Sequence, residues 1–154
     1  MRVFVILNNI RSAHNVGSIF RTADGAGVSK IYITGYTPAP YDRFGREQKE
    51  ILKTSLGATH TVPFEVFENI HELIEQLKNE GVAIVSVEQT PTAVAYKTFV
   101  PKGDTAFIFG NEITGVEESV LALSDKHIML PMGGAKESLN VSVCAGIILF
   151  HFKN

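Results

Sequence analysis

The sequence predicts an α/β fold in which a mostly parallel sheet carries helices on both faces. Short apolar runs rich in β-branched residues, such as VFVIL at residues 3–7 and VAIVSV at residues 82–87, are typical of buried strands. Stretches with helical periodicity separate these runs. Strands that alternate with helices favour right-handed crossovers and parallel pairing.

Six strands and five helices are expected along the chain. The strands are predicted at residues 3–7, 30–34, 61–67, 82–87, 106–109 and 127–130. The helices are predicted at residues 15–26, 45–56, 69–80, 116–122 and 138–152. The third helix has clear end signals, because Asn69 and Glu72 resemble a capping box and Gly81 is a typical stop.

Composition bounds the class of protein. The 154 residues are 45% hydrophobic and 19% charged, which is typical of one globular domain spanning residues 1–154. The single cysteine, Cys144, excludes an internal disulfide framework and a cysteine-rich zinc site. A net charge of -2 argues against a strongly basic protein that wraps nucleic acid. No run approaches the roughly 18 apolar residues of a membrane helix, so we expect a cytoplasmic protein without membrane or metal partners.

Three polar segments follow predicted strands. The first, NIRSAHNVGSIFR at residues 9–21, leads into a helix that places Arg21 among the small residues Gly17 and Gly25. Ligands bind at the carboxyl ends of parallel strands, which favours a functional Arg21. Taken alone, a solvated arginine on a helix face is the better explanation, and the two glycines weaken it. Two glycines inside a helix each cost about 1 kcal/mol relative to alanine and need a reason.

The second and third segments also join a strand to a helix. AFIFGNEITG at residues 106–115 brings Gly110 and Glu112 to the end of a buried strand, where either a tight turn or a ligand site would use them. In the third segment, at residues 130–150, Ser138 is expected to cap a helix whose first turn holds Asn140. Free backbone N–H groups at that end favour an anion, and the rest of the helix is apolar nearly all round, which indicates burial in a core or against a partner.

Taken together and in order, the three segments resemble the SpoU (TrmH) family of the SPOUT superfamily, RNA ribose 2′-O-methyltransferases that use S-adenosylmethionine. The three motifs that carry the resemblance are NVGSIFR at residues 15–21, FGNE at residues 109–112 with Gly115, and LPMG at residues 130–133 through SLNVS at residues 138–142. The resemblance covers nearly the whole chain. It implies a deep C-terminal trefoil knot that holds the cofactor, a homodimer joined through the knot helices, and a minimal domain without an accessory RNA-binding module.

The resemblance also implies roles for individual residues. The catalytic and positioning candidates are Arg21, Asn15, Glu112, Ser138 and Asn140. Arg21 would activate the ribose hydroxyl, as a base or, with less conflict with the basicity of a guanidinium, by binding phosphate and stabilising the alkoxide. Glu112 would orient Arg21 or the ribose. The cofactor candidates are Val87, Glu88, Gln89, Gly110, Leu130, Met132, Ser138 and Leu139.

Basic residues before and within the second predicted helix are the candidates for RNA contact. They are Arg43, Arg46, Lys49 and Lys53, to which Arg11 in the first polar segment is added. Tyr36, Tyr41 and Phe44 lie nearby in the sequence and could stack on unpaired bases. The competing interpretation is an amphipathic helix whose charges pair at i,i+4 and face solvent.

The leading hypothesis is methyl transfer from S-adenosylmethionine to a ribose 2′-hydroxyl of RNA, with tRNA favoured over rRNA. Methylation of an RNA base, or a non-catalytic RNA-binding or assembly protein on the same fold, remain alternatives. A dinucleotide-binding domain is disfavoured, because no G-x-G-x-x-G follows the first strand.

Overall fold

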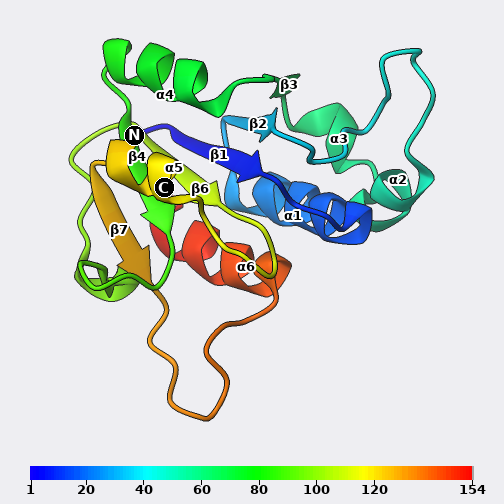
Figure 1. Ribbon diagram of the computed structural model, residues 1–154. Coiled ribbons are helices and arrows are strands. Elements are labelled where there is room, and N and C mark those ends of the chain that lie inside the picture. Colours follow the sequence, from blue (N-terminus) through cyan, green and yellow to red (C-terminus); the bar gives the residue numbers. More distant parts are fainter. Residues whose placement is uncertain (154) are drawn as a thin grey trace.

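The fold is built on one parallel sheet, described here for residues 1–153 of a computed structural model. Seven strands pair in the order β3-β2-β1-β6-β4-β7-β5, all of them parallel (Figure 1). In chain order the strands are β1 Val3–Asn8, β2 Lys30–Thr34, β3 Phe64–Val66, β4 Ala83–Val87, β5 Val94–Ala95, β6 Thr105–Phe109 and β7 Lys126–Met129. The predicted α/β class and parallel sheet are confirmed.

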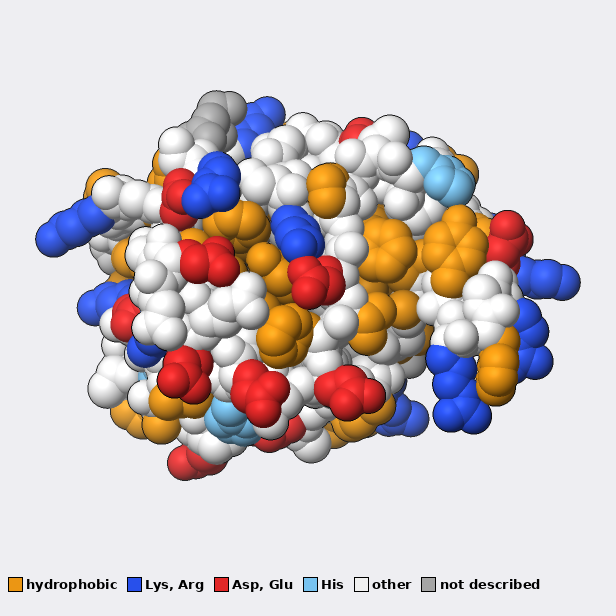
Figure 2. All heavy atoms as spheres, turned by 90° about the horizontal axis from the view of Figure 1, so that it is seen from above, with side chains coloured by type: hydrophobic (Ala, Val, Ile, Leu, Met, Phe, Trp, Pro, Cys, Tyr) orange, Lys and Arg blue, Asp and Glu red, His pale blue; other side chains and the backbone are white. Residues whose placement is uncertain are grey.

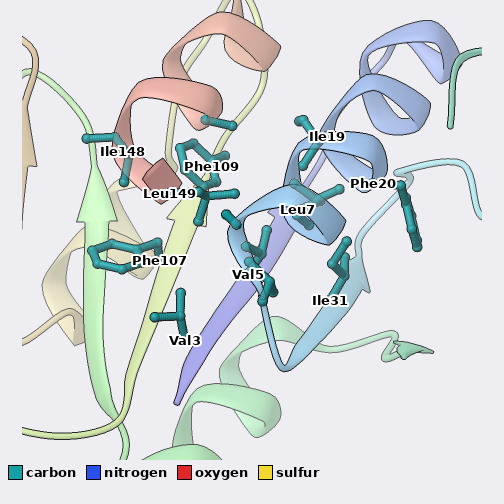
Figure 3. Packing of buried hydrophobic residues seen from close by; sticks show 14 of the residues in the cluster. Val3, Val5, Leu7, Ile19, Phe20, Ile31, Phe107, Phe109, Ile148 and Leu149 are labelled. Carbon is teal, nitrogen blue, oxygen red and sulfur yellow. The ribbon is translucent and has the colours of Figure 1, made fainter. Parts of the chain in front are cut away.

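Helices cover both faces of this sheet (Figure 1). They are α1 Ala13–Ala26, α2 Lys49–Ser55, α3 Ala58–Thr61, α4 Ile70–Asn79, α5 Glu118–Leu123 and α6 Val141–Phe152, with a short 3₁₀ helix, η1, at Tyr96–Thr98. Successive side chains of β1 point to opposite faces. Val5 belongs to the core beneath α1 and α6, whereas Phe4 belongs to the core beneath α4 (Figure 3). Every side chain of β1 is buried, which explains the continuous apolar run at residues 3–7.

Several elements differ from the sequence-based expectation, among them the short helix α3, which was not predicted. The helix expected from residue 45 begins at Lys49, because residues 41–47 form a hydrogen-bonded turn in which Gly45 has a φ of 77°. The helix expected from Ser138 begins at Val141, and its cap is Asn140, whose side-chain oxygen accepts hydrogen bonds from the amides of Ser142 and Val143. The short strand β5 and η1 were not predicted.

The last helix, α6, lies beside α1 and runs in the same direction. The Asn140 amide donates to the Asn15 side-chain oxygen over 3.3 Å at their N-terminal ends, and Phe150 meets Gly25 near their C-terminal ends. At the end of α6, Phe152 stacks on Phe107 of β6 at 5.0 Å and meets Phe99, which follows η1, at 5.7 Å. The end of α6 is therefore enclosed between the sheet and the segment that joins β5 to β6. This enclosure is what a threaded C terminus requires, and the trefoil knot itself stays a prediction.

Within residues 1–153, no helix has the length and apolar character needed to cross a bilayer. The most apolar helix, α6, has only 12 residues, against the roughly 20 that a bilayer requires.

Close packing of α1 against α2 explains a glycine inside a helix. A Cβ at Gly17 would lie 1.8 Å from the Thr54 hydroxyl and 2.6 Å from the carbonyl oxygen of Ile51. The Thr54 hydroxyl also donates to the carbonyl of His14, so the two helices are fixed at this separation.

We therefore expect Gly17→Ala to destabilise the fold by about 1–3 kcal/mol or more, since the added carbon meets backbone. Chemical denaturation of the two chains measures this loss. Gly103→Ala is the matched control, because nothing lies within 4 Å of a Cβ built there. Equal unfolding free energies for the Gly17 and Gly103 variants would contradict the close-packing explanation.

Candidate active site

A cavity of about 970 Å³ opens at the carboxyl ends of three adjacent strands, β6, β4 and β7. Its walls come from residues 87–92 at the end of β4, residues 109–116 at the end of β6, and residues of α5. Residues 129–130 at the end of β7, residues 137–139, and Val141 and Cys144 of α6 complete them. Because parallel strands end at one edge of the sheet, segments far apart in the sequence meet here. The volume is within the range of sites that enclose a small molecule or cofactor.

Glycines let the loop after β6 fold tightly at the cavity wall. A Cβ at Gly110 would lie 2.5 Å from backbone atoms of Gly115, and one at Gly115 would lie 2.1 Å from the Glu88 carboxylate. That carboxylate accepts a hydrogen bond of 2.9 Å from the amide of Val116. Glu88 thus joins the end of β4 to the loop after β6. A side chain at Gly115 would push the two apart, and one at Gly110 would collide with backbone within the loop itself.

Glu112 binds the loop that leads into α1. Its carboxylate accepts hydrogen bonds from the backbone N–H of Arg11 at 2.9 Å and of Ser12 at 3.3 Å. Ser12 is the N-cap of α1, where the helix dipole also favours a negative charge. The carboxylate is engaged by these two amides and forms no ion pair with Arg21 in the described chain, so the expected role of Glu112, orienting Arg21 or the ribose, stays a prediction.

Asn111 adds a second connection between the same segments. Its side-chain nitrogen donates to the carbonyl oxygen of Asn9 at 3.0 Å and to the hydroxyl of Tyr36 at 2.9 Å. Its side-chain oxygen accepts from the amides of Ile113 and Thr114. With only 7% of its surface exposed, Asn111 is fixed by contacts on both sides of its amide.

The cofactor candidates lie together with one exception. Seven of the eight line the cavity, namely Val87, Glu88, Gln89, Gly110, Leu130, Ser138 and Leu139. Met132 does not, because residues 131–136 run away from the cavity as an extended surface loop (Figure 1). The Gln89 amide donates to the carbonyl oxygen of Glu137 at 2.5 Å and so joins the loop after β4 to the one that precedes α6.

The catalytic candidates are more dispersed. Glu112 and Ser138 line the cavity, whereas Asn15 and Asn140 bind each other just outside it. Arg21 lies further along α1, exposed to solvent, and makes no hydrogen bond or ion pair with any residue of the described chain.

The RNA candidates Arg11, Arg43, Arg46, Lys49 and Lys53 are all exposed.

His127 and Cys144 are among the cavity residues that were not singled out as site residues. His127 is held by the Leu121 carbonyl at Nε2 and the Thr90 hydroxyl at Nδ1, both at 2.9 Å. Since a carbonyl only accepts, Nε2 carries the proton and Nδ1 accepts from Thr90. Cys144 also lines the cavity, and its burial raises the pKa of its thiol to about 12. The only sequence signal of either residue was its place within a predicted strand or helix.

The charged side chains around the cavity are mainly carboxylates. Its described lining has four glutamates, Glu88, Glu112, Glu118 and Glu137, one histidine, and neither lysine nor arginine. No group of three or more metal-ligating side chains occurs among residues 1–153. The cavity therefore favours a cationic or neutral ligand over a phosphate.

Comparison with known proteins places this geometry in context. The model of the SpoU rRNA methylase family matches residues 2–150. A tRNA (guanosine(18)-2′-O)-methyltransferase of Thermus thermophilus is 34% identical over 95% of this chain and 71% of its own length. A 23S rRNA (guanosine-2′-O-)-methyltransferase RlmB of Neisseria meningitidis is 31% identical over 96% of this chain, which spans 56% of that relative.

A solved structure shares the fold closely. The AdoMet-bound rRNA methyltransferase from Sinorhizobium meliloti superposes with a TM-score of 0.88 at 26% identity, over 99% of this chain and 57% of that chain. This chain therefore spans little more than half the length of some relatives that it matches.

The contact between Glu112 and the loop before α1 gives a direct prediction. Glu112→Ala leaves the amides of Arg11 and Ser12 without their charged acceptor, a loss of about 1.5–3 kcal/mol per hydrogen bond. We expect hydrogen exchange at these two amides to accelerate by roughly ten- to hundredfold. Glu112→Gln keeps the acceptor oxygen without the charge and should show a smaller acceleration. Unchanged exchange in Glu112→Ala would mean that other contacts hold this loop.

Proposed function

Because the chain belongs to the SpoU rRNA methylase family, we propose that it transfers the methyl group of S-adenosylmethionine to a ribose 2′-hydroxyl of RNA, with tRNA favoured over rRNA. The observation that carries the proposal is the cavity at the ends of β4, β6 and β7, bound through Glu112 to the loop that begins α1. Relatives named as guanosine 2′-O-methyltransferases of tRNA and 23S rRNA support the reaction and the substrate. An RNA substrate agrees with the cytoplasmic location expected from composition.

The residues that line the cavity suit the chemistry of S-adenosylmethionine. Val87, Leu130 and Leu139 offer apolar walls for an adenine ring, and four glutamates without a lysine or arginine favour a sulfonium cation. Gly110 and Gly115 keep the wall thin, since a Cβ at either position would meet neighbouring atoms. When bound there, the cofactor would supply an electrophilic methyl group.

The protein's own residues would position the hydroxyl and stabilise charge. An exposed guanidinium stays protonated, so Arg21 serves better as an electrostatic group than as a base. We assign it to the phosphate beside the target ribose and to the developing alkoxide, while the hydroxyl proton leaves to solvent. Asn15 and Asn140, which bind each other at the helix ends, would set the position of α1 relative to the cavity.

An exposed hairpin-like turn at residues 41–47 supports RNA binding. Its base is the bridge between Tyr41 and Glu47, and the guanidinium groups of Arg43 and Arg46 lie 4.8 Å and 5.1 Å from the centre of the Phe44 ring. Phe44 itself is 66% exposed. Lys and Arg side chains project at this end of the molecule, the right-hand end of Figure 2. Flat cationic and aromatic groups together are suited to phosphates and unpaired bases.

The competing helix interpretation is wrong for Arg46. This residue precedes α2 and pairs with Asp42 at 2.7 Å rather than with Glu50. Lys49 and Lys53 form no ion pair within residues 1–153 and remain available to phosphate.

The uncovered face of α6 supports a homodimer. Val143, Ile147 and Phe150 recur at helical spacing and are 51%, 37% and 46% exposed. Leaving such a stripe in water forgoes about 25 cal/mol per Å² of apolar surface. A second copy related by a two-fold axis would lay the same stripe against itself, which fits the dimer through the knot helices that the resemblance implies.

Labelled S-adenosylmethionine incubated with total RNA tests the proposed reaction. After digestion to nucleosides, we expect the label in 2′-O-methylnucleosides for the wild-type chain. Arg21→Ala should lower the transfer by at least the roughly 100-fold typical of a lost electrostatic contact in a transition state. Its calorimetric affinity for S-adenosylmethionine should be unchanged, because Arg21 does not line the cavity.

Three results would contradict the proposal. Label in methylated bases would establish base methylation, and no label together with RNA binding would establish a non-catalytic RNA-binding protein. Undiminished transfer by Arg21→Ala would remove the role assigned to this residue.

The dimer is tested by Ile147→Lys, which puts a charge in the middle of the apolar stripe. Light scattering should give the mass of a dimer for the wild-type chain and of a monomer for the variant. Val100→Lys is the matched control, since Val100 is 75% exposed and lies outside α6. A monomeric wild-type chain would contradict the proposed assembly.

A further inference from the structure

Tyr36 presents an aromatic ring to solvent while its hydroxyl is bound at the candidate active site. Tyr36 is 62% exposed, yet its hydroxyl accepts a hydrogen bond of 2.9 Å from the buried side-chain amide of Asn111. Asn111 lines the cavity and also binds the backbone of Asn9. The ring therefore has a fixed position beside the cavity, outside its wall.

The backbone of Tyr36 is fixed as well. It follows Gly35, which has a φ of 63°, and a Cβ at Gly35 would lie 1.8 Å from the Asn9 side-chain oxygen. That oxygen accepts a hydrogen bond from the amide of Tyr36. Next in the chain, the buried Thr37 donates its hydroxyl to the carbonyl of Leu7 and accepts from the amide of Ile10. This turn is thus bound to the end of β1, and little freedom remains for the ring to lose on binding.

The surrounding charges indicate which part of an RNA this ring would meet. Glu112 binds the amides of Arg11 and Ser12, and Glu117 accepts a hydrogen bond from the side chain of Asn9. Two carboxylates around this turn oppose a phosphate at the ring itself, and they leave phosphate contact to the exposed Arg11 and Arg21. A neutral, flat base has no such penalty and gains from stacking on an aromatic face.

We propose that Tyr36 is a positioning residue whose ring stacks on the base of the nucleotide to be methylated, or on its immediate neighbour, and that the substrate is therefore an RNA segment with an unpaired base. The inference rests on the RNA substrate proposed above. Stacking would hold the sugar at the cavity through the base, without reading the base edge. A paired base is already stacked within its helix and cannot offer its face, so unpaired loops are the substrate class.

The absence of tryptophan from the sequence allows a direct binding test. Tyr36→Trp puts a single indole at this position, and its fluorescence should be quenched by single-stranded oligoadenylate at low salt. The same oligonucleotide annealed to oligouridylate should quench it far less. Val100→Trp, exposed on the segment before β6, is the matched control and should respond to neither RNA. Equal quenching by the single strand and the duplex, or none, overturns the proposal.

Kinetics separate stacking from a structural role. Tyr36→Ala should lower kcat/KM for RNA by about 5- to 150-fold, the range expected for one lost base–aromatic stack. Tyr36→Phe keeps the ring but loses the hydrogen bond to Asn111, so its kcat/KM should fall between those of Tyr36→Ala and the wild-type chain. The calorimetric affinity for S-adenosylmethionine should not change in either variant.

The outcomes distinguish the two proposals. Wild-type methylation of RNA with full activity in Tyr36→Ala overturns the role of Tyr36 and leaves the proposed function intact. Loss of cofactor affinity in Tyr36→Ala also overturns it, because the residue would then be supporting Asn111. If the wild-type chain methylates no RNA, the proposed function fails, and the fluorescence comparison alone decides whether the ring stacks on unpaired bases.

Discussion

The Glu112 carboxylate accepts hydrogen bonds from two backbone amides that lie about a hundred residues earlier in the chain. Through this contact the loop after β6 sets the start of α1, and α1 in turn meets α6 through Asn15 and Asn140. Hydrogen bonds to a charged acceptor contribute about 1.5–3 kcal/mol each, so the contact is strong enough to decide where the loop lies. The contact thus connects the cavity to the helix that carries Asn15 and Arg21.

Parallel pairing explains why such a contact can form at all. Because β1, β6, β4 and β7 are neighbours and run in the same direction, four loops that leave their carboxyl ends share one edge of the sheet. The glycines at positions 110 and 115 then let two backbone segments approach more closely than any side chain would allow. The sign of the charged side chains differs between two parts of this end of the molecule. Glutamates surround the cavity, where a sulfonium would bind, and the arginine-flanked Phe44 lies on the separate turn at residues 41–47, where phosphates would bind.

Local patterns sufficed for six of the seven strands and for most helices, because burial and turn chemistry depend on neighbouring residues. Seven of the eight cofactor candidates, which the resemblance implied, line the cavity, and their contact with the cofactor stays a prediction. At two positions another local contact formed instead, because Asn140 rather than Ser138 caps α6 and Arg46 pairs with Asp42 rather than with Glu50. Local patterns also failed where a distant partner decides the outcome. The role of Glu112 depends on amides at residues 11 and 12, and the hydroxyl of Tyr36 binds Asn111, 75 residues away. Neither contact has a local sequence signal. The reason for Gly17 was equally hidden, since it is the close approach of α2.

Hydrogen exchange of the intact chain with and without S-adenosylmethionine tests most directly whether the separate loops form one site. The account predicts added protection in residues 87–92, 109–116 and 137–141 together, with a smaller effect at residues 9–15 through Glu112. Protection restricted to the α4 surface at residues 71–79, or none at saturating cofactor, would contradict it.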